Sequence, residues 1–169
     1  MENRNKLKPL ILTLTIFLVD QVSKLMIVNS IPIHTIGKSF LGGFLRIIHT
    51  RNLAIAFSLG NKLPDGVRYV LFTILPIAIL IGLLIYYLQG DDFTNIQRWA
   101  VAGILGGGIG NLTDRVFRPL GVVDFIDVKF YGIFGLERWP TFNVADSMVV
   151  VSGLLLLFSF IFEDLKKHE

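Results

Sequence analysis

The sequence contains no cysteine, which excludes disulfide bonds, thiolate metal ligands and a cysteine nucleophile. It has no Gly-x-Ser-x-Gly motif, so the nucleophile elbow of many serine hydrolases is excluded as well. The three histidines, His34, His49 and His168, lie far apart and lack the spacing of a metal site. Charged residues are scarce at 17%. With a net charge of only +3 and no basic stripe, we expect no nucleic-acid partner.

Long apolar runs are the dominant feature. The chain is 53% hydrophobic over 169 residues and its mean hydropathy is +0.64, values typical of integral membrane proteins. A helix crosses the hydrocarbon core with about 20 apolar residues. We therefore expect one integral membrane domain over residues 1–169, an all-α membrane protein. Its four transmembrane helices are predicted at about 9–28, 68–88, 97–115 and 144–163.

Two longer segments separate the predicted helices. Residues 29–67 are rich in residue types that suit strands and predict a small β-rich extramembrane cap. Residues 118–142 carry several glycines and prolines and predict a loop that serves as a lid. Four crossings place both termini on the same side of the membrane. The basic tails favour the cytoplasm for both, although basic residues elsewhere weaken this charge rule.

Charged residues in or next to the apolar spans have a structural and a functional interpretation. Asp20 and Lys24 are four residues apart, so they share a helix face and can form an ion pair. This pair is either a structural one at the membrane interface, with Lys24 reaching toward water, or an anchor for the cap or a lipid headgroup. Asp114 and Arg115 are neighbours on different helix faces, which predicts separate partners. Arg115 is suited to hold a carboxylate or a substrate carbonyl.

Glycines concentrate in the third predicted helix. The run Gly106 to Gly110 lacks the Lys and the Ser or Thr of a phosphate-binding P-loop. Its glycines are spaced instead as small-xxx-small pairs, the pattern that lets helices approach closely. We therefore expect this run to serve helix packing.

Two short segments near the last apolar run, residues 121–127 and 142–147, contain three aspartates: Asp124, Asp127 and Asp146. Two carboxyl groups that share a proton can activate a water molecule and protonate a leaving group, the chemistry of aspartic peptidases. Alternatively, the first two are solvated loop residues and Asp146 caps the last helix. Asn143 is the better residue for the N-cap, which leaves Asp146 free for other contacts. Spacing alone does not choose between Asp124 and Asp127.

Two other functional classes stay open on residue chemistry alone. Intramembrane charges also mark the ion pathways of transporters and proton relays. The chain shows no internal repeat, and its carboxylates gather toward one membrane face, which counts against a transporter. A structural assembly factor held together by ion pairs is the remaining alternative.

Five ordered motifs resemble those of the lipoprotein signal peptidases, or type II signal peptidases, which are aspartic peptidases of the bacterial inner membrane. The resemblance extends over essentially the whole chain. The motifs are Asp-Gln-x-Ser-Lys at 20–24, Arg-Asn…Ala-Phe at 51–57, Gly-Asn-x-x-Asp-Arg at 110–115, Val-Val-Asp-Phe-Ile at 122–126 and Phe-Asn-x-Ala-Asp-Ser at 142–147.

The resemblance implies that Asp124 and Asp146 form the catalytic dyad, and it leaves Asp127 outside the motif. The other polar positions of the family pattern, which bind substrate or support the dyad, are Asp20, Lys24, Asn52, Asn111, Arg115 and Asn143. The implied substrate is a prolipoprotein whose cysteine already carries diacylglycerol, cut just before that cysteine on the periplasmic side. The implied enzyme needs no metal or other cofactor. It is a multi-pass inner-membrane protein with both termini cytoplasmic, a monomer with membrane lipids around it.

Two short segments depart from the family pattern. The chain has Ala54-Ile55-Ala56 where the family usually has Gly-Ala-Ala, which affects the loop of the cap and its expected substrate contacts. Between Arg115 and Asp124 the chain is slightly longer, with Arg118-Pro119 added. We expect this addition to lengthen a surface turn without moving the aspartates.

Overall fold

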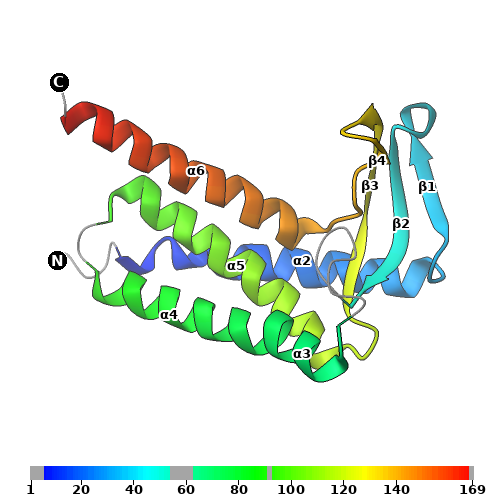
Figure 1. Ribbon diagram of the computed structural model, residues 1–169, viewed down its shortest axis with the longest axis horizontal. Coiled ribbons are helices and arrows are strands. Elements are labelled where there is room, and N and C mark those ends of the chain that lie inside the picture. The colour runs from blue at the N-terminus through cyan, green and yellow to red at the C-terminus, as the bar shows by residue number, and fades with distance from the viewer. Residues whose placement is uncertain (1–5, 54–62, 91–92, 168–169) are drawn as a thin grey trace.

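The computed structural model describes residues 6–53, 63–90 and 93–167, as a bundle of helices with a small sheet at one end (Figure 1). The helical elements are α2 (Leu10–Ser30), η1 (Leu41–Gly43), α3 (Asp65–Tyr69), η3 (Val70–Ile74), α4 (Leu75–Gln89), α5 (Asn95–Phe117) and α6 (Val144–Lys167). The strands are β1 (Ile36–Phe40), β2 (Leu45–Asn52), β3 (Val122–Ile133) and β4 (Leu136–Arg138). α2 begins and α6 ends at the end of the bundle away from the sheet.

Helix α5 is the central element of the bundle and packs against α2, α4 and α6. Its glycines permit this close packing. A Cβ atom on Gly107 would lie 2.4 Å from the carbonyl oxygen of Ala145 in α6, and one on Gly106 would lie 2.9 Å from that of Thr13 in α2. Either substitution would force the helices apart. The predicted packing role of this glycine run is confirmed.

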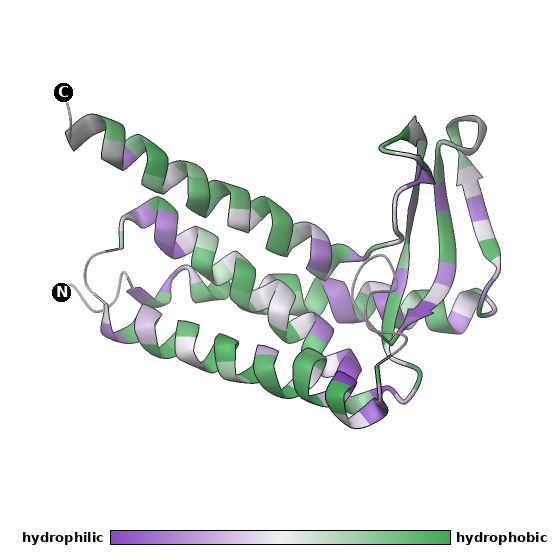
Figure 2. Ribbon diagram, viewed as in Figure 1, coloured by the Kyte–Doolittle hydropathy of each residue, from purple (hydrophilic) through white to green (hydrophobic). Residues whose placement is uncertain are grey.

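The outer helices consist mostly of apolar residues, as the green colour along most of their length in Figure 2 shows. Three helices are long and apolar enough to cross a membrane, namely Leu10–Ser30, Asp65–Gln89 and Val144–Glu163 among the described residues. Large hydrophobic side chains such as Ile11, Ile79 and Leu157 are more than half exposed, as expected for surfaces that face lipid. The fold is thus mostly helical, with three apolar candidates for membrane spans. A fourth crossing by α5 stays a prediction at this point.

The four strands form one antiparallel sheet in the order β1-β2-β3-β4. β1 and β2 come from residues 29–67, so strands are confirmed in that part of the cap. The predicted loop over residues 118–142 was wrong, because β3 spans 12 of its residues and pairs with β2 and β4. A role of this segment as a lid stays a prediction. The glycines that suggested a loop lie at or near the strand ends instead: Gly121 precedes β3, Gly132 lies next to its last residue and Gly135 precedes β4, and all three have positive φ.

Candidate active site

Asp124 lies on β3 close to the end of the helical bundle, and its side chain is only 3% exposed. Both of its carboxylate oxygens accept hydrogen bonds from neutral amides. Asn52 Nδ2 on β2 donates to one oxygen at 3.1 Å, and Asn143 Nδ2 donates to the other at 2.7 Å. β2 and β3 are antiparallel neighbours, and this pairing brings Asn52 to the same end of the sheet. Within the described part of the chain, the hydrogen bonds to the carboxylate of Asp124 come from these two neutral amides.

Asp146 lies in the first turn of α6, where it takes part in a reciprocal helix cap. Its backbone N–H donates to Asn143 Oδ1 at 2.9 Å, while its own Oδ2 accepts the backbone N–H of Asn143 at 3.1 Å. This is the geometry of a capping box. The predicted N-cap at Asn143 is confirmed. Asp146, which we expected to be free for other contacts, also takes part in this helix cap. Its second oxygen accepts a hydrogen bond from Asn111 Nδ2 at 2.7 Å.

Two asparagines connect the two aspartates. Asn143 Nδ2 lies within hydrogen-bond distance of Asp124 Oδ1 and, at 3.0 Å, of Asn111 Oδ1. Asn111 in turn donates to Asp146. The hydrogen-bonded path from one carboxyl group to the other therefore passes through two amide side chains from α5 and the start of α6. Such a path holds both carboxyl groups in one orientation.

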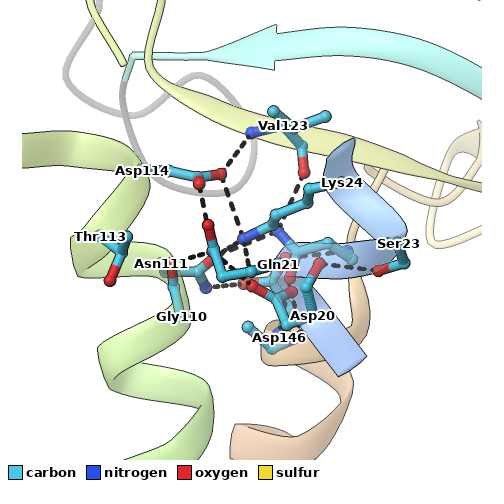
Figure 3. A network of polar contacts seen from close by, with 12 residues as sticks. Asp20, Gln21, Ser23, Lys24, Gly110, Asn111, Thr113, Asp114, Val123 and Asp146 are labelled. Atoms are coloured by element: carbon cyan, nitrogen blue, oxygen red, sulfur yellow. Dashed lines mark hydrogen bonds and ion pairs between the residues drawn. The ribbon is translucent and has the colours of Figure 1, made fainter. Parts of the chain in front are cut away.

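Behind these amides lies a buried charge cluster centred on Lys24 (Figure 3). Lys24 Nζ lies 2.8 Å from Asp20 and 3.2 Å from Asp114, and all three side chains are fully buried. The same nitrogen donates to Asn111 Oδ1 at 3.0 Å. The predicted Asp20–Lys24 pair is confirmed. Its interpretation as an interfacial pair with Lys24 reaching toward water was wrong, because Lys24 points into the cluster where it has three oxygen partners.

Asp114 and Arg115 have the separate partners that their sequence neighbourhood predicts. Asp114 pairs with Lys24 and, at 2.8 Å, with Arg118. Arg115 lies over the ring of Phe72 at 5.8 Å, a cation–π geometry. Arg115 also lines the cavity that Asp124 and Asp146 share.

A cavity of about 500 Å³ brings most of the predicted site residues together, but Asp20, Lys24 and Asn143 do not line it. Its polar lining consists of Asn52, Asn111, Arg115, Asp124, Asp146 and Ser147, with Thr141. The rest of its wall includes Phe142 and apolar residues of α6. A second cavity, of about 230 Å³, shares Asn111 and Arg115 with the first. The rest of its lining is apolar and comes from η3, α4, α5 and α6. The polar site thus adjoins apolar space within the bundle.

Burial raises the pKa of Asp124 from 3.8 to about 7, and the nearby charge of Asp146 adds to this effect. The hydrogen bonds from Asn52 and Asn143 and the charge of Lys24 act in the opposite direction and keep the pKa from rising further. At neutral pH, Asp124 is therefore divided between its protonated and ionised forms. A carboxyl group in this state can either give or take a proton during a reaction.

Asp127 has quite different surroundings on the same strand. Arg138 Nε donates to both of its oxygens, at 2.6 and 2.7 Å, and Asp127 does not line the cavity. The structure thus separates Asp124 from Asp127, a choice that sequence spacing alone left open. No group of three or more His, Asp or Glu side chains is placed to hold a metal ion within residues 6–53, 63–90 and 93–167.

Two residues of this network were not predicted as site residues. Gln21 Nε2 donates to Asp20 and Asp114, and Asp114 accepts from the backbone of β3. A sequence signal for Asp114 exists, since it lies three residues after Asn111 and so on the same face of α5. The departure at Ala54-Ile55-Ala56 lies outside the described residues.

The arrangement of helices and sheet is that of a bacterial membrane enzyme. A solved structure of such an enzyme, determined by the in meso method at 2.3 Å resolution, superposes with a TM-score of 0.79. It covers 94% of this chain and 90% of that protein, at 28% sequence identity. A second structure, at 1.9 Å resolution, gives a TM-score of 0.75 over 90% of this chain and 91% of that one, again at 28% identity.

Sequence comparison identifies the family. Residues 12–162 match the profile of signal peptidase (SPase) II. The lipoprotein signal peptidase of Treponema pallidum is 48% identical over 158 residues, which cover 94% of this chain and 85% of that protein. That of Treponema denticola is 44% identical over 161 residues, 95% of this chain and 92% of the relative. The chain belongs to the signal peptidase II family and is a membrane peptidase of the aspartic type. Membership favours a peptidase over a transporter or an assembly factor.

Proposed function

We propose that this protein removes the signal peptide from diacylglyceryl-modified prolipoproteins by hydrolysing the peptide bond just before the lipidated cysteine. Asp124 and Asp146 form the catalytic dyad that activates the water molecule. The observation that carries the proposal is the placement of both carboxyl groups on one cavity, joined by the amides of Asn111 and Asn143. Relatives named lipoprotein signal peptidase support the substrate class.

The proposed reaction needs one proton shared between the two carboxyl groups. Asp124 carries it in the resting enzyme, because its pKa of about 7 keeps much of it protonated at neutral pH. Asp146 is the ionised member and removes a proton from a water molecule placed between the two groups. The water oxygen attacks the scissile carbonyl while Asp124 donates its proton to the carbonyl oxygen. The tetrahedral intermediate then collapses as Asp146 passes its proton to the leaving amine, and Asp124 recovers its proton from the hydroxyl group.

The supporting residues position the dyad and the peptide. Asn52, Asn111 and Asn143 hold the carboxyl groups by hydrogen bonds. Arg115 lines the cavity beside both aspartates and is placed to hold a peptide carbonyl. The apolar walls of the two adjoining cavities suit the lipid part of the substrate, whose binding energy helps to place the scissile bond.

The position of the site and the sheet at one end of the bundle supports the proposed topology. α5 crosses the membrane as a fourth helix, sheltered by α2, α4 and α6, in a single domain over residues 1–169. The site and the sheet lie at the periplasmic face of the bacterial inner membrane, and both termini lie in the cytoplasm. The protein acts as a monomer surrounded by membrane lipids and requires no cofactor.

The test uses the full-length protein in detergent with a prolipoprotein in two forms, one carrying the diacylglyceryl group on its cysteine and one unmodified. Mass spectrometry of the products locates the bond that is cut. We expect cleavage just before the modified cysteine, no cleavage of the unmodified form, and no cleavage of either by Asp146→Asn. Equal cleavage of both forms would contradict the substrate class. Full activity of a folded Asp146→Asn variant would contradict the dyad.

A further inference from the structure

Two backbone N–H groups near the site are held in the same unusual way. Val123, the residue before Asp124, donates its N–H to Asp114 Oδ2 at 3.0 Å. Ala145, the residue before Asp146, donates its N–H to Asp20 Oδ1 at 3.0 Å. Each aspartate of the proposed dyad thus follows directly on a residue whose backbone is fixed by a buried carboxylate. These two carboxylates come from different helices, α5 and α2.

Lys24 connects these two carboxylates. Its ammonium group lies between Asp20 and Asp114, 2.8 and 3.2 Å from their oxygens, with no solvent exposure of any of the three side chains (Figure 3). Two buried carboxylates repel each other strongly, and a cation between them offsets this repulsion. Lys24 therefore holds the two acceptors together at one point of the buried cluster.

A third connection runs directly to the dyad. Lys24 Nζ donates to Asn111 Oδ1, which leaves Asn111 Nδ2 to donate to Asp146 Oδ1. The ammonium group thereby orients the amide, because it can contact only the oxygen end of that side chain. One buried cation is linked to the backbone before Asp124, to the backbone before Asp146, and to the carboxyl group of Asp146 itself.

We infer that Lys24 is a positioning residue that sets the separation of the two catalytic carboxyl groups, acting through Asp20 and Asp114 as paired backbone clamps. This inference rests on the proposed function of Asp124 and Asp146. Lys24 and its two clamps, Asp20 and Asp114, line neither of the two cavities at the site. Their role is therefore to position the dyad and not to contact the substrate.

The activity test compares variants that keep or lose the Asp114 clamp or the cation of Lys24. Asp114→Asn retains an oxygen for the Val123 N–H, whereas Asp114→Leu removes it. Lys24→Met keeps a side chain of similar length and removes the cation. Because a misplacement of about 1 Å can cost on the order of 100-fold, we expect Lys24→Met and Asp114→Leu to lower kcat by about that factor. KM should stay close to that of the wild type, and Asp114→Asn should retain more of kcat than Asp114→Leu.

Gln97→Leu is the matched control, because it removes a buried polar link at the opposite end of α5. Gln97 is 2% exposed and donates to Glu163 in α6 at 3.0 Å. Its loss should lower the melting temperature without changing kcat for the folded protein. A merely structural role for Lys24 predicts the same outcome for Lys24→Met, so this comparison separates positioning from stability.

A distance measurement tests positioning without an activity assay. Since the chain has no cysteine, single cysteines at the exposed positions Ile133 on β3 and Leu154 on α6 can each carry a spin label. Pulsed electron paramagnetic resonance then gives the distribution of distances between the two elements that bear the dyad. We expect a wider distribution in Lys24→Met and an unchanged one in Gln97→Leu.

The outcomes separate this inference from the proposed function. If Asp124→Asn and Asp146→Asn are inactive while folded Lys24→Met keeps the wild-type kcat, the positioning role is wrong and the dyad stands. A higher KM in Lys24→Met, with kcat and the distance distribution unchanged, would also overturn it. If Lys24→Met does not fold, the Asp114→Asn and Asp114→Leu pair decides, and equal kcat values for the two would overturn the inference.

Discussion

Asp124 and Asp127 lie three residues apart on β3 and are almost equally buried, at 3% and 5% exposure, yet their surroundings differ completely. Asp127 has a guanidinium group on its two oxygens, at 2.6 and 2.7 Å from Arg138 Nε. Asp124 has two neutral amides and a second carboxyl group nearby. One aspartate is neutralised by a dedicated partner, whereas the other shares its surroundings with Asp146.

This difference supports the proposal that Asp124, and not Asp127, takes part in the reaction. When a cation donates to both oxygens of a buried carboxylate, it stabilises the ionised form, and such a pair has a structural role. A buried carboxyl group held by amides and facing another carboxyl group keeps its proton up to higher pH. In the proposed mechanism the strand supplies one structural and one reactive aspartate, and the partner of each side chain distinguishes them where burial does not.

The largest expected effect is the loss of cleavage in Asp124→Asn. An amide cannot donate the proton that the reaction requires, and general acid–base groups contribute about 10²- to 10⁴-fold to rates. We expect kcat for the lipidated substrate to fall by about 10³-fold, measured with protein shown to be folded by its melting temperature. Asp127→Asn is the matched control and should keep kcat within about twofold for the folded fraction. An equal fall of kcat in Asp124→Asn and Asp127→Asn would contradict the proposed difference between the two aspartates.

The second effect concerns pH. Because the pKa of Asp124 is about 7, the shared proton is present below this value and is lost as the pH rises through it. We expect kcat to decline above about pH 7, approaching a tenfold decrease for each further unit. A series of initial rates from pH 5 to 9 measures this decline. A rate that still rises from pH 7 to 9 would mean that the reactive form is fully deprotonated.

A smaller effect is expected from Asn52→Leu, which removes one amide from Asp124. The hydrogen bond from Asn52 lowers the pKa of Asp124, so its loss should raise that pKa and move the alkaline decline to higher pH. We also expect kcat at pH 6 to fall by about tenfold, because the carboxyl group is less well oriented. A shift of the decline to lower pH would contradict the assigned role of Asn52.

The stability of the folded state should also depend on Asp124. Its pKa is higher in the folded protein than the ordinary 3.8, so stability decreases as the pH rises from about 4 to about 7. Asp124→Asn removes this penalty, and we expect its melting temperature to exceed that of the wild type by a few degrees at pH 8 and to match it near pH 4. A variant less stable than the wild type at pH 8 would contradict this sign.

The smallest effects belong to the structural aspartate. Asp127→Asn leaves Arg138 without its counter-charge, and we expect a loss of about 1 to 3 kcal/mol in stability, seen as a lower melting temperature. Adding Arg138→Gln to this variant should recover part of the lost stability, since no charge of the pair is then left without a partner. Recovery in the double variant, with kcat close to the wild type throughout, would identify the pair as purely structural.

Local patterns in the sequence predicted the local features of the fold. The glycine run, the Asp20–Lys24 pair and the N-cap at Asn143 depend on residues within one or two helical turns. The sheet could not be predicted in the same way, because β2 and β3 pair across some 70 residues of chain. The glycines at 121, 132 and 135 therefore suggested a loop where a strand exists.

The choice of Asp124 over Asp127 depends on contacts that spacing does not encode. Arg138 reaches Asp127 only because β4 folds back along β3. Lys24 is buried only because carboxylates from two helices surround it, whereas a lysine near a helix end would ordinarily reach toward water. Long-range geometry decides both cases, and for Asp124 the resemblance to the family supplied what local chemistry lacked.

The most direct test of the central claim is a titration of Asp124 itself, followed by the carboxyl carbon signal of labelled aspartate in nuclear magnetic resonance. In the wild type we expect a midpoint near pH 7, and in Asp146→Asn a lower one, because the charge of Asp146 raises the pKa of Asp124. Asp124→Asn identifies the signal. A midpoint close to the ordinary 3.8 in the wild type, or one that Asp146→Asn leaves unchanged, would contradict a coupled dyad.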